Sequence, residues 1–186
     1  MTEMKVWALW RDGKIAEDEA RLLRQKAGEV PVPFDDDGKR DIARVEDSFL
    51  ERDDAAGLAA PQIGISKRII AFRSKSIDGM PRRGSDDYEV LINPRITQAR
   101  GDKIKDTEGC LSCPDLNVDV VRFQTVKVKA LDKNGNTVNR RYTGFIARVV
   151  QHEIDHLEGT LIVDRGTRIY YPQDKAAFFR SLFSEK

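Results

Sequence analysis

The stretch from Thr125 to Thr143 constrains the fold more than any other part of the chain. Its two halves, residues 125–131 and 137–143, have the composition of β-strands, and the Asn134-Gly135 pair between them is a strong signal for a hairpin turn. Further runs of strand composition precede it, at residues 67–72, 88–97 and 117–123. Because these strands are grouped and do not alternate with helices, the sequence predicts an α+β fold.

Helical patterns are fewer. Residues 35–54 place Ile42, Val45, Phe49 and Leu50 on one helical face behind an acidic start. Residues 145–158 break from the strand pattern and stop at Gly159, a residue type that commonly ends helices. The other expected elements are a short helix within residues 17–35, loops at 55–64 and 74–87, a strand at 160–164 and a C-terminal helix at 174–183.

Size and charge exclude several classes of protein. The 186 residues suit one domain spanning 1–186, and the net charge of +1 gives no global attraction to nucleic acid, so no specific nucleic acid is expected as a partner. No apolar run approaches the roughly 18 residues that a membrane span needs. The first residues also lack a secretory pattern. We therefore expect a cytoplasmic protein that does not bind membranes.

The sequence QHEIDH at residues 151–156 holds the only two histidines of the chain, His152 and His156. Residues four apart lie on one face of a helix, so both imidazoles can bind one metal ion, with Glu153 as the general base. A catalytic site of this kind usually has three protein ligands and one open position. No third histidine exists, and a thiolate from Cys110 or Cys113 is the other ligand type available, one that suits iron(II) or zinc.

Three stretches in series resemble the motifs of peptide deformylases: GLAAPQIG at residues 57–64, EGCLS at 108–112 and QHEIDH at 151–156. The resemblance implies a single catalytic domain in which antiparallel or mixed sheets wrap around a central helix that carries the H-E-x-x-H motif. It also implies Cys110, His152 and His156 as the ligands of one divalent ion. Iron(II) is the favoured ion, and zinc, nickel and cobalt also suit this ligand set.

The implied activity is removal of the N-formyl group from the N-terminal methionine of newly made polypeptides, with release of formate. Glu153 takes a proton from the attacking water, while the N–H of Leu111 and the side-chain amide of Gln62 stabilise the oxyanion. The residues implied to contact the peptide are Ala56, Gly57, Arg122, Phe145 and Val149. The implied partners are N-formyl-methionyl nascent peptides and the ribosome near its exit tunnel, although the short C-terminal tail is not obviously a docking helix.

Some positions depart from the family pattern. Ala55 stands where the family usually has a glycine, Arg148 stands where an apolar residue is frequent, and the first 35 residues lack the usual opening. Cys113 is expected to be a small buried side chain. Two rival functions are an H-E-x-x-H peptidase with a third ligand downstream of His156, and a catalytically silent metal-binding relative.

Overall fold

The structure, a computed structural model, describes residues 5–75 and 87–183. Its main sheet has the strand order β3-β4-β5-β6-β7, with β8 also paired to β6, and every one of these pairings is antiparallel. A separate two-stranded sheet, β1 with β2, lies near the N-terminus. The strands are β1 (Trp10–Arg11), β2 (Lys14–Ile15), β3 (Gly57–Ala59), β4 (Ile69–Arg73), β5 (Tyr88–Gly109), β6 (Asn117–Leu131), β7 (Thr137–Thr143) and β8 (Arg168–Tyr170).

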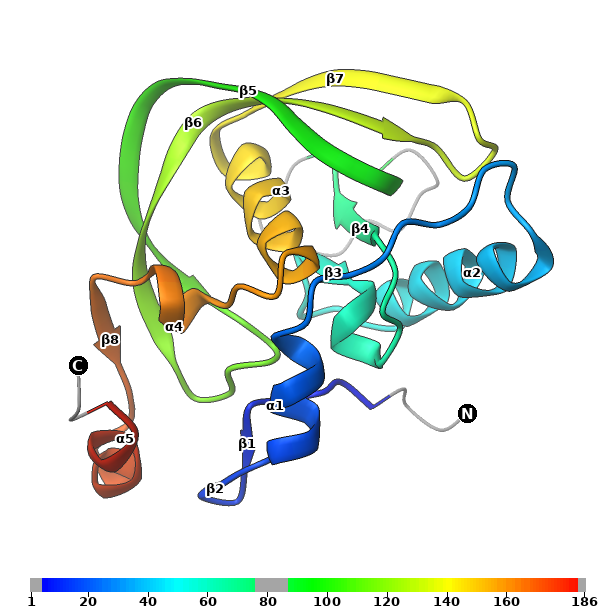
Figure 1. Cartoon of the computed structure of the whole chain (residues 1–186). Helices are drawn as coiled ribbons and strands as arrows, with labels where there is room; N and C mark the ends of the chain where they lie inside the picture. Colours follow the sequence, from blue (N-terminus) through cyan, green and yellow to red (C-terminus); the bar gives the residue numbers. More distant parts are fainter. Residues whose placement is uncertain (1–4, 76–86, 184–186) are drawn as a thin grey trace.

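The helices pack against both faces of this sheet. Figure 1 shows α3 beneath the arch that β5, β6 and β7 form, while α2 lies beyond β3 and β4. The expected α+β fold, with sheet strands wrapped around the helix of the H-E-x-x-H motif, is therefore confirmed. The helical elements are α1 (Glu17–Leu23), α2 (Asp36–Leu50), η1 (Ala60–Ile63), α3 (Gly144–Leu157), α4 (Ile162–Arg165), η2 (Gln173–Lys175) and α5 (Ala176–Phe183).

Strand β4 is apolar on both faces because it separates two helices. Successive side chains of a strand point to opposite faces. Ile70 and Phe72 pack in the core cluster that contains α3, whereas Ile69 and Ala71 pack in the cluster that contains α2. This sandwiching holds α3 at a fixed depth in the molecule.

The predicted hairpin and the predicted α2 helix are both confirmed. Leu131 of β6 pairs with Thr137 of β7, and Gly135 adopts φ +84° in the turn between them. Helix α2 begins after Asp35, whose side chain accepts a hydrogen bond from the N–H of Gly38 at 2.7 Å. Such N-terminal caps satisfy one of the free backbone donors of a helix.

Two expectations about local structure are wrong. Residues 160–164 were expected to form a strand, but Ile162–Arg165 form the one-turn helix α4. Asp164 closes this turn, since its Oδ2 accepts from the N–H of Leu161 at 2.9 Å, and burial of the apolar residues here outweighs their strand propensity. The segment expected as a loop at residues 55–64 instead contains β3 and η1. The loop expected at 74–87 falls for the most part, residues 76–86, outside the described residues.

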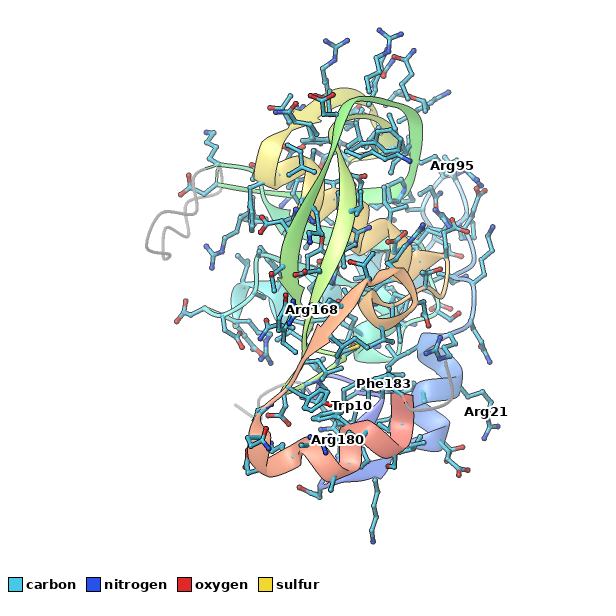
Figure 2. All side chains as sticks on the ribbon, turned by 90° about the vertical axis from the view of Figure 1, so that its left-hand side faces the viewer. Trp10, Arg21, Arg95, Arg168, Arg180 and Phe183 are labelled. Atoms are coloured by element: carbon cyan, nitrogen blue, oxygen red, sulfur yellow. The ribbon has the colours of Figure 1, made fainter. Side chains whose placement is uncertain are left out.

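The N-terminal and C-terminal segments pack against each other. The rings of Trp10 and Phe179 lie 5.4 Å apart edge to face, and Figure 2 shows Trp10 beside the C-terminal helix. The expected helices near both ends are confirmed as α1 and α5. Within the described ranges, none of the helices has the length and apolar character needed to cross a membrane.

Candidate active site

Three candidate metal ligands converge where the end of β5 meets α3. His152 and His156 lie one turn apart on α3, and Cys110 directly follows the last residue of β5. The Sγ atom of Cys110 lies 3.3 Å from Nε2 of His156, and ligand atoms of all three side chains lie within 4.8 Å of one another. One thiolate and two imidazoles at this spacing fit a divalent metal ion, and three protein ligands are the number typical of catalytic sites.

Glu108 fixes the orientation of one imidazole. Its Oε2 lies 3.0 Å from Nδ1 of His152, which leaves Nε2 of that ring for a metal. Burial raises the pKa of Glu108, but hydrogen bonds from Arg122 and His152 outweigh this effect and hold the pKa well below its usual range. Glu108 is therefore a carboxylate that serves as an outer partner of the metal ligand.

Cys113 lies directly behind the thiol ligand. Its N–H donates to the carbonyl oxygen of Cys110 at 2.9 Å, and its side chain is fully buried, as the sequence predicted. A hydrogen bond from the Cys113 thiol, together with the neighbouring histidines, lowers the pKa of Cys110 against the opposing effect of burial. These contacts favour the thiolate, which is the form of cysteine that binds metals.

Glu153 is buried with one carboxylate oxygen unpaired. Its side chain is 3% exposed, and Oε2 has no hydrogen-bond partner among the described residues. Gly57 lies against it, because a Cβ atom built on Gly57 would be only 2.4 Å from Oε1 of Glu153. Burial raises the pKa of Glu153, so this carboxylate is a stronger base than an exposed one.

The side chain of Gln62 is held in one orientation. Its Oε1 accepts from the N–H of Ala59 at 2.8 Å, and its Nε2 donates to Oγ of Ser112 at 3.2 Å. The same Nε2 lies 3.9 Å from the Sγ of Cys110. The amide N–H₂ group therefore points toward the candidate metal ligands, and the amide oxygen points away from them.

A cavity of about 400 Å³ opens beside these groups. Its walls come from the segment before β3, the end of β5 and the loop after it, and one face of α3. Nine of the residues expected at the site line it: Ala56, Gly57, Gln62, Cys110, Leu111, Phe145, Val149, His152 and Glu153. His156 lies behind them, 1% exposed.

Comparisons with known proteins agree with this geometry. The sequence profile described as "Polypeptide deformylase" matches residues 13–170. A peptide deformylase of Symbiobacterium thermophilum is 42% identical over 159 residues, which cover 84% of this chain and 67% of that protein. The chain belongs to the peptide deformylase family.

Solved structures of other deformylases share the fold of the enzyme. A ligand-bound class I type b peptide deformylase from Acinetobacter baumannii superimposes with a TM-score of 0.72 at 34% identity, covering 89% of this chain and 99% of that one. A structure of an Acinetobacter baumannii deformylase bound to Met-Ala-Ser gives a TM-score of 0.70 at 33% identity, covering 87% and 99% of the two chains. The enzyme is thus a metal-dependent hydrolase with peptide deformylase activity, which acts on formylated nascent peptides.

Arg122 lies apart from the other expected site residues in the enzyme. It does not line the 400 Å³ cavity, and its side chain is 5% exposed. Its guanidinium donates to both oxygens of Glu108 at 2.9 Å and to Oδ2 of Asp155 at 2.5 Å. All of these donors point into the protein, so the geometry gives no support to the expected contact between Arg122 and the peptide.

Several residues of this buried network were not singled out from the sequence. Asp155 accepts from Arg122 and also from Arg165, at 2.6 and 3.0 Å, and Glu108 accepts from Arg148 at 2.6 Å. A signal was present in strand β6, where Arg122 shares a face with the buried Val118 and Val120. An arginine on a buried face requires a carboxylate partner, and Glu108 lies on the neighbouring strand β5, four positions beyond Ile104, the direct partner of Arg122.

Proposed function

We propose that the enzyme removes the formyl group from the N-terminal formylmethionine of new polypeptides through a reaction centred on Glu153. The observation that carries this proposal is one cavity bordered by a Cys-His-His ligand set, an unpaired buried carboxylate and an oriented amide. A divalent ion held by Cys110, His152 and His156 would supply a Lewis acid that makes water acidic near neutral pH. We propose iron(II) as the native ion, as the family resemblance implies; zinc, nickel and cobalt also fit a ligand set of one thiolate and two imidazoles.

Glu153 is proposed to move the proton. Its free oxygen faces no competing donor among the described residues, and its raised pKa suits a group that first accepts and then gives up a proton. It takes the proton of the attacking water and passes it to the leaving amine of methionine. The carbon–nitrogen bond of the formamide then breaks, and formate and a free amino terminus are the products.

Gln62 and Leu111 are proposed to stabilise the negative charge that develops on the formyl oxygen. The amide N–H₂ of Gln62 is already fixed toward the ligands, and Leu111 follows Cys110 directly, so that its N–H is close to the same place. One such donor typically lowers a barrier by about 2.7–4 kcal/mol. A carboxylate in place of the Gln62 amide would repel the oxyanion.

The peptide is proposed to bind as an added strand. Within the described residues, β3 pairs only with β4, and the last residues of β5 pair only with β6, so one edge of each borders the cavity unpaired. An extended peptide can hydrogen-bond along such edges near Ala56 and Gly57. The methionine side chain would then enter the apolar part of the cavity beside Phe145 and Val149. Arg122 is proposed to act by holding Glu108.

The whole chain is proposed to act as one catalytic unit in the cytoplasm. The family profile covers residues 13–170, and described residues near both termini, Trp10 and Phe179 among them, belong to one core cluster. Newly made polypeptides leave the ribosome at its exit tunnel, so we propose the ribosome as a neighbour of the enzyme during its work.

One assay tests the proposal. The protein is purified without oxygen in the presence of iron(II) and incubated with formyl-Met-Ala-Ser, and formate is measured. We expect turnover by the native chain and a loss of about 10²–10⁴ in kcat for Glu153→Gln, because the proton carrier is gone. Metal content, measured by mass spectrometry, should be the same in both proteins.

Cys110→Ala separates the alternatives. A deformylase site loses one of three ligands and should retain far less metal than the native chain, whereas an H-E-x-x-H peptidase with a different third ligand would keep it. Full metal occupancy with no formate from the native chain would instead identify the silent binding protein.

A further inference from the structure

A second cavity adjoins the one that holds the candidate active site. It measures about 200 Å³, half of the 400 Å³ beside the ligands, and its walls include Ile104, Phe123, Phe145 and Arg148. Phe145 and Arg148 line both cavities, so these two side chains form the partition between them. The two differ in how firmly they are held, since Phe145 is 50% exposed and Arg148 is buried.

Arg148 is tied across the gap between the helix and the sheet. It lies on α3 one turn before His152. Its Nη1 donates to Oε1 of Glu108 at 2.6 Å and to the carbonyl oxygen of Val120 at 3.1 Å, while its Nη2 donates to the carbonyl oxygen of Ile104 at 2.7 Å. Glu108 and Ile104 lie on β5 and Val120 lies on β6. Swinging the guanidinium aside would break all three of these hydrogen bonds, which is unfavourable.

Arg148 is therefore the part of the partition that is held by hydrogen bonds, whereas Phe145 is half exposed. An apolar slot accepts a longer side chain only if one of its walls can open, and here the wall toward the second cavity includes a guanidinium bonded to two strands. Beyond the wall lies further space lined partly by the apolar Ile104 and Phe123. The wall therefore limits the length of the slot.

We propose that Arg148 is a specificity-determining residue that restricts the first side chain of the substrate to about the length of methionine by closing the slot against the second cavity. This inference rests on the proposed function, because it assumes that the first side chain enters the cavity beside Phe145 and Val149. It concerns the length of that side chain and not the chemistry at the formyl group.

A series of substrates with straight side chains tests the proposal. Formyl-X-Ala-Ser peptides are compared in which X is methionine, norleucine, 2-aminooctanoic acid or 2-aminodecanoic acid. We expect kcat/KM of the native chain to fall once X is longer than methionine. In Arg148→Ala the two cavities join, and each further buried methylene should then favour binding by about fourfold. The ratio of kcat/KM for the aminooctanoyl peptide over the methionyl peptide should rise by about tenfold, mainly through KM.

Arg148→Lys is the matched control. Lysine keeps the charge and most of the length of the side chain, so the ratio should stay closer to that of the native chain than to that of Arg148→Ala. Arg148→Leu serves as a second opening variant, because it shortens the side chain without placing a small residue in the core. Metal content and the thermal midpoint of unfolding are measured for every variant.

A binding measurement separates this proposal from the proposed function. Dissociation constants of the unformylated peptides Met-Ala-Ser and 2-aminooctanoyl-Ala-Ser are measured by calorimetry, and they report the slot whether or not formate is released. Absence of formate from the native chain would refute the proposed function alone. An unchanged binding ratio in metal-loaded Arg148→Ala and Arg148→Leu, or equal binding of both peptides to the native chain, would refute the role of Arg148.

Discussion

Position 57 requires a glycine because there is no room for a side chain, and not because the backbone there adopts a conformation that only glycine tolerates. A Cβ at this position would lie 2.4 Å from Oε1 of Glu153 and 2.8 Å from its Cδ and Cγ, distances that no packed structure accommodates without movement. The glycine therefore sets where the carboxylate stands in the cavity. The two alanines that precede it, Ala55 and Ala56, line the same cavity.

Gly57→Ala should accordingly displace the carboxylate. We expect kcat on formyl-Met-Ala-Ser to fall by about 10²-fold, since proton transfer needs hydrogen-bond reach, and unfolding to become easier by about 1–3 kcal/mol because of overpacking. Steady-state formate release and urea unfolding check these values. Gly28→Ala is the matched control, since its Cβ would meet only the carbonyl oxygen of Ser66 at 3.7 Å. A kcat of Gly57→Ala equal to that of the native chain would contradict the prediction that the position of the Glu153 carboxylate limits proton transfer.

At the scale of single residues, spacing alone predicted the paired histidines and Glu153. The choice of Cys110 over Cys113 came from the resemblance, and the geometry agrees, because Cys113 lies behind Cys110 and not among the ligand atoms. The strand pattern indicated that Arg122 is buried, but it could not name the carboxylate partners, which come from two other elements. Side-chain networks of this kind depend on which strands and helices meet, which periodicity does not specify.

At the scale of elements, the strand expected within β5 was in the right place but too short. Residues 88–97 were expected as a strand, and β5 runs on to Gly109. The chain contains apparent breaks, Pro94 and Gly101, but both coincide with register shifts in the pairing of β5 with β6. Bulges accommodate a proline or a glycine with positive φ without ending a strand. The continuous β5 is what carries Cys110 to α3.

Helix α4 depends on one aspartate. Asp164 accepts the Leu161 N–H and also receives Arg24 at 2.9 and 3.0 Å. Asp164→Ala should lower the free energy of unfolding by about 1–2 kcal/mol, the usual effect of losing a helix cap. Urea unfolding measures the change, and formate release should stay native because the residue lies outside the cavity. Asp174→Ala, an exposed aspartate of η2, is the control; an equal effect of both would contradict the cap assignment.

At the scale of the whole molecule, the segment before α1 braces the active site. The N–H of Trp7 donates to the carbonyl oxygen of Gln62 at 2.7 Å, and the N–H of Leu9 donates to that of Ser112 at 2.9 Å. Sequence patterns could not place this segment, because its partners lie far along the chain and bond through the main chain. Glu19 anchors it by accepting from Lys5, Arg11 and the N–H of Ala8.

Acid should loosen this anchor. Burial raises the pKa of Glu19, but hydrogen bonds from Lys5, Ala8 and Arg11 outweigh that effect and lower the pKa from 4.5 to about 2. A depressed pKa means that the stabilisation is complete above pH 4.5 and is lost as the pH falls toward 2. The thermal midpoint of Glu19→Gln should therefore lie below that of the native chain at pH 6, and the gap should narrow toward pH 2. A gap of constant size across this range would contradict the assignment.

The distance in sequence between the ligands has a further consequence. Cys110 and His156 are 46 positions apart, and they meet only after the β5–β6 pair has closed and α3 has been seated beneath it. No fragment that ends before residue 156 holds the complete trio. During its own synthesis this chain therefore stays inert at least until residue 156 has been added, and a copy terminated before it has no activity however well its sheet is formed.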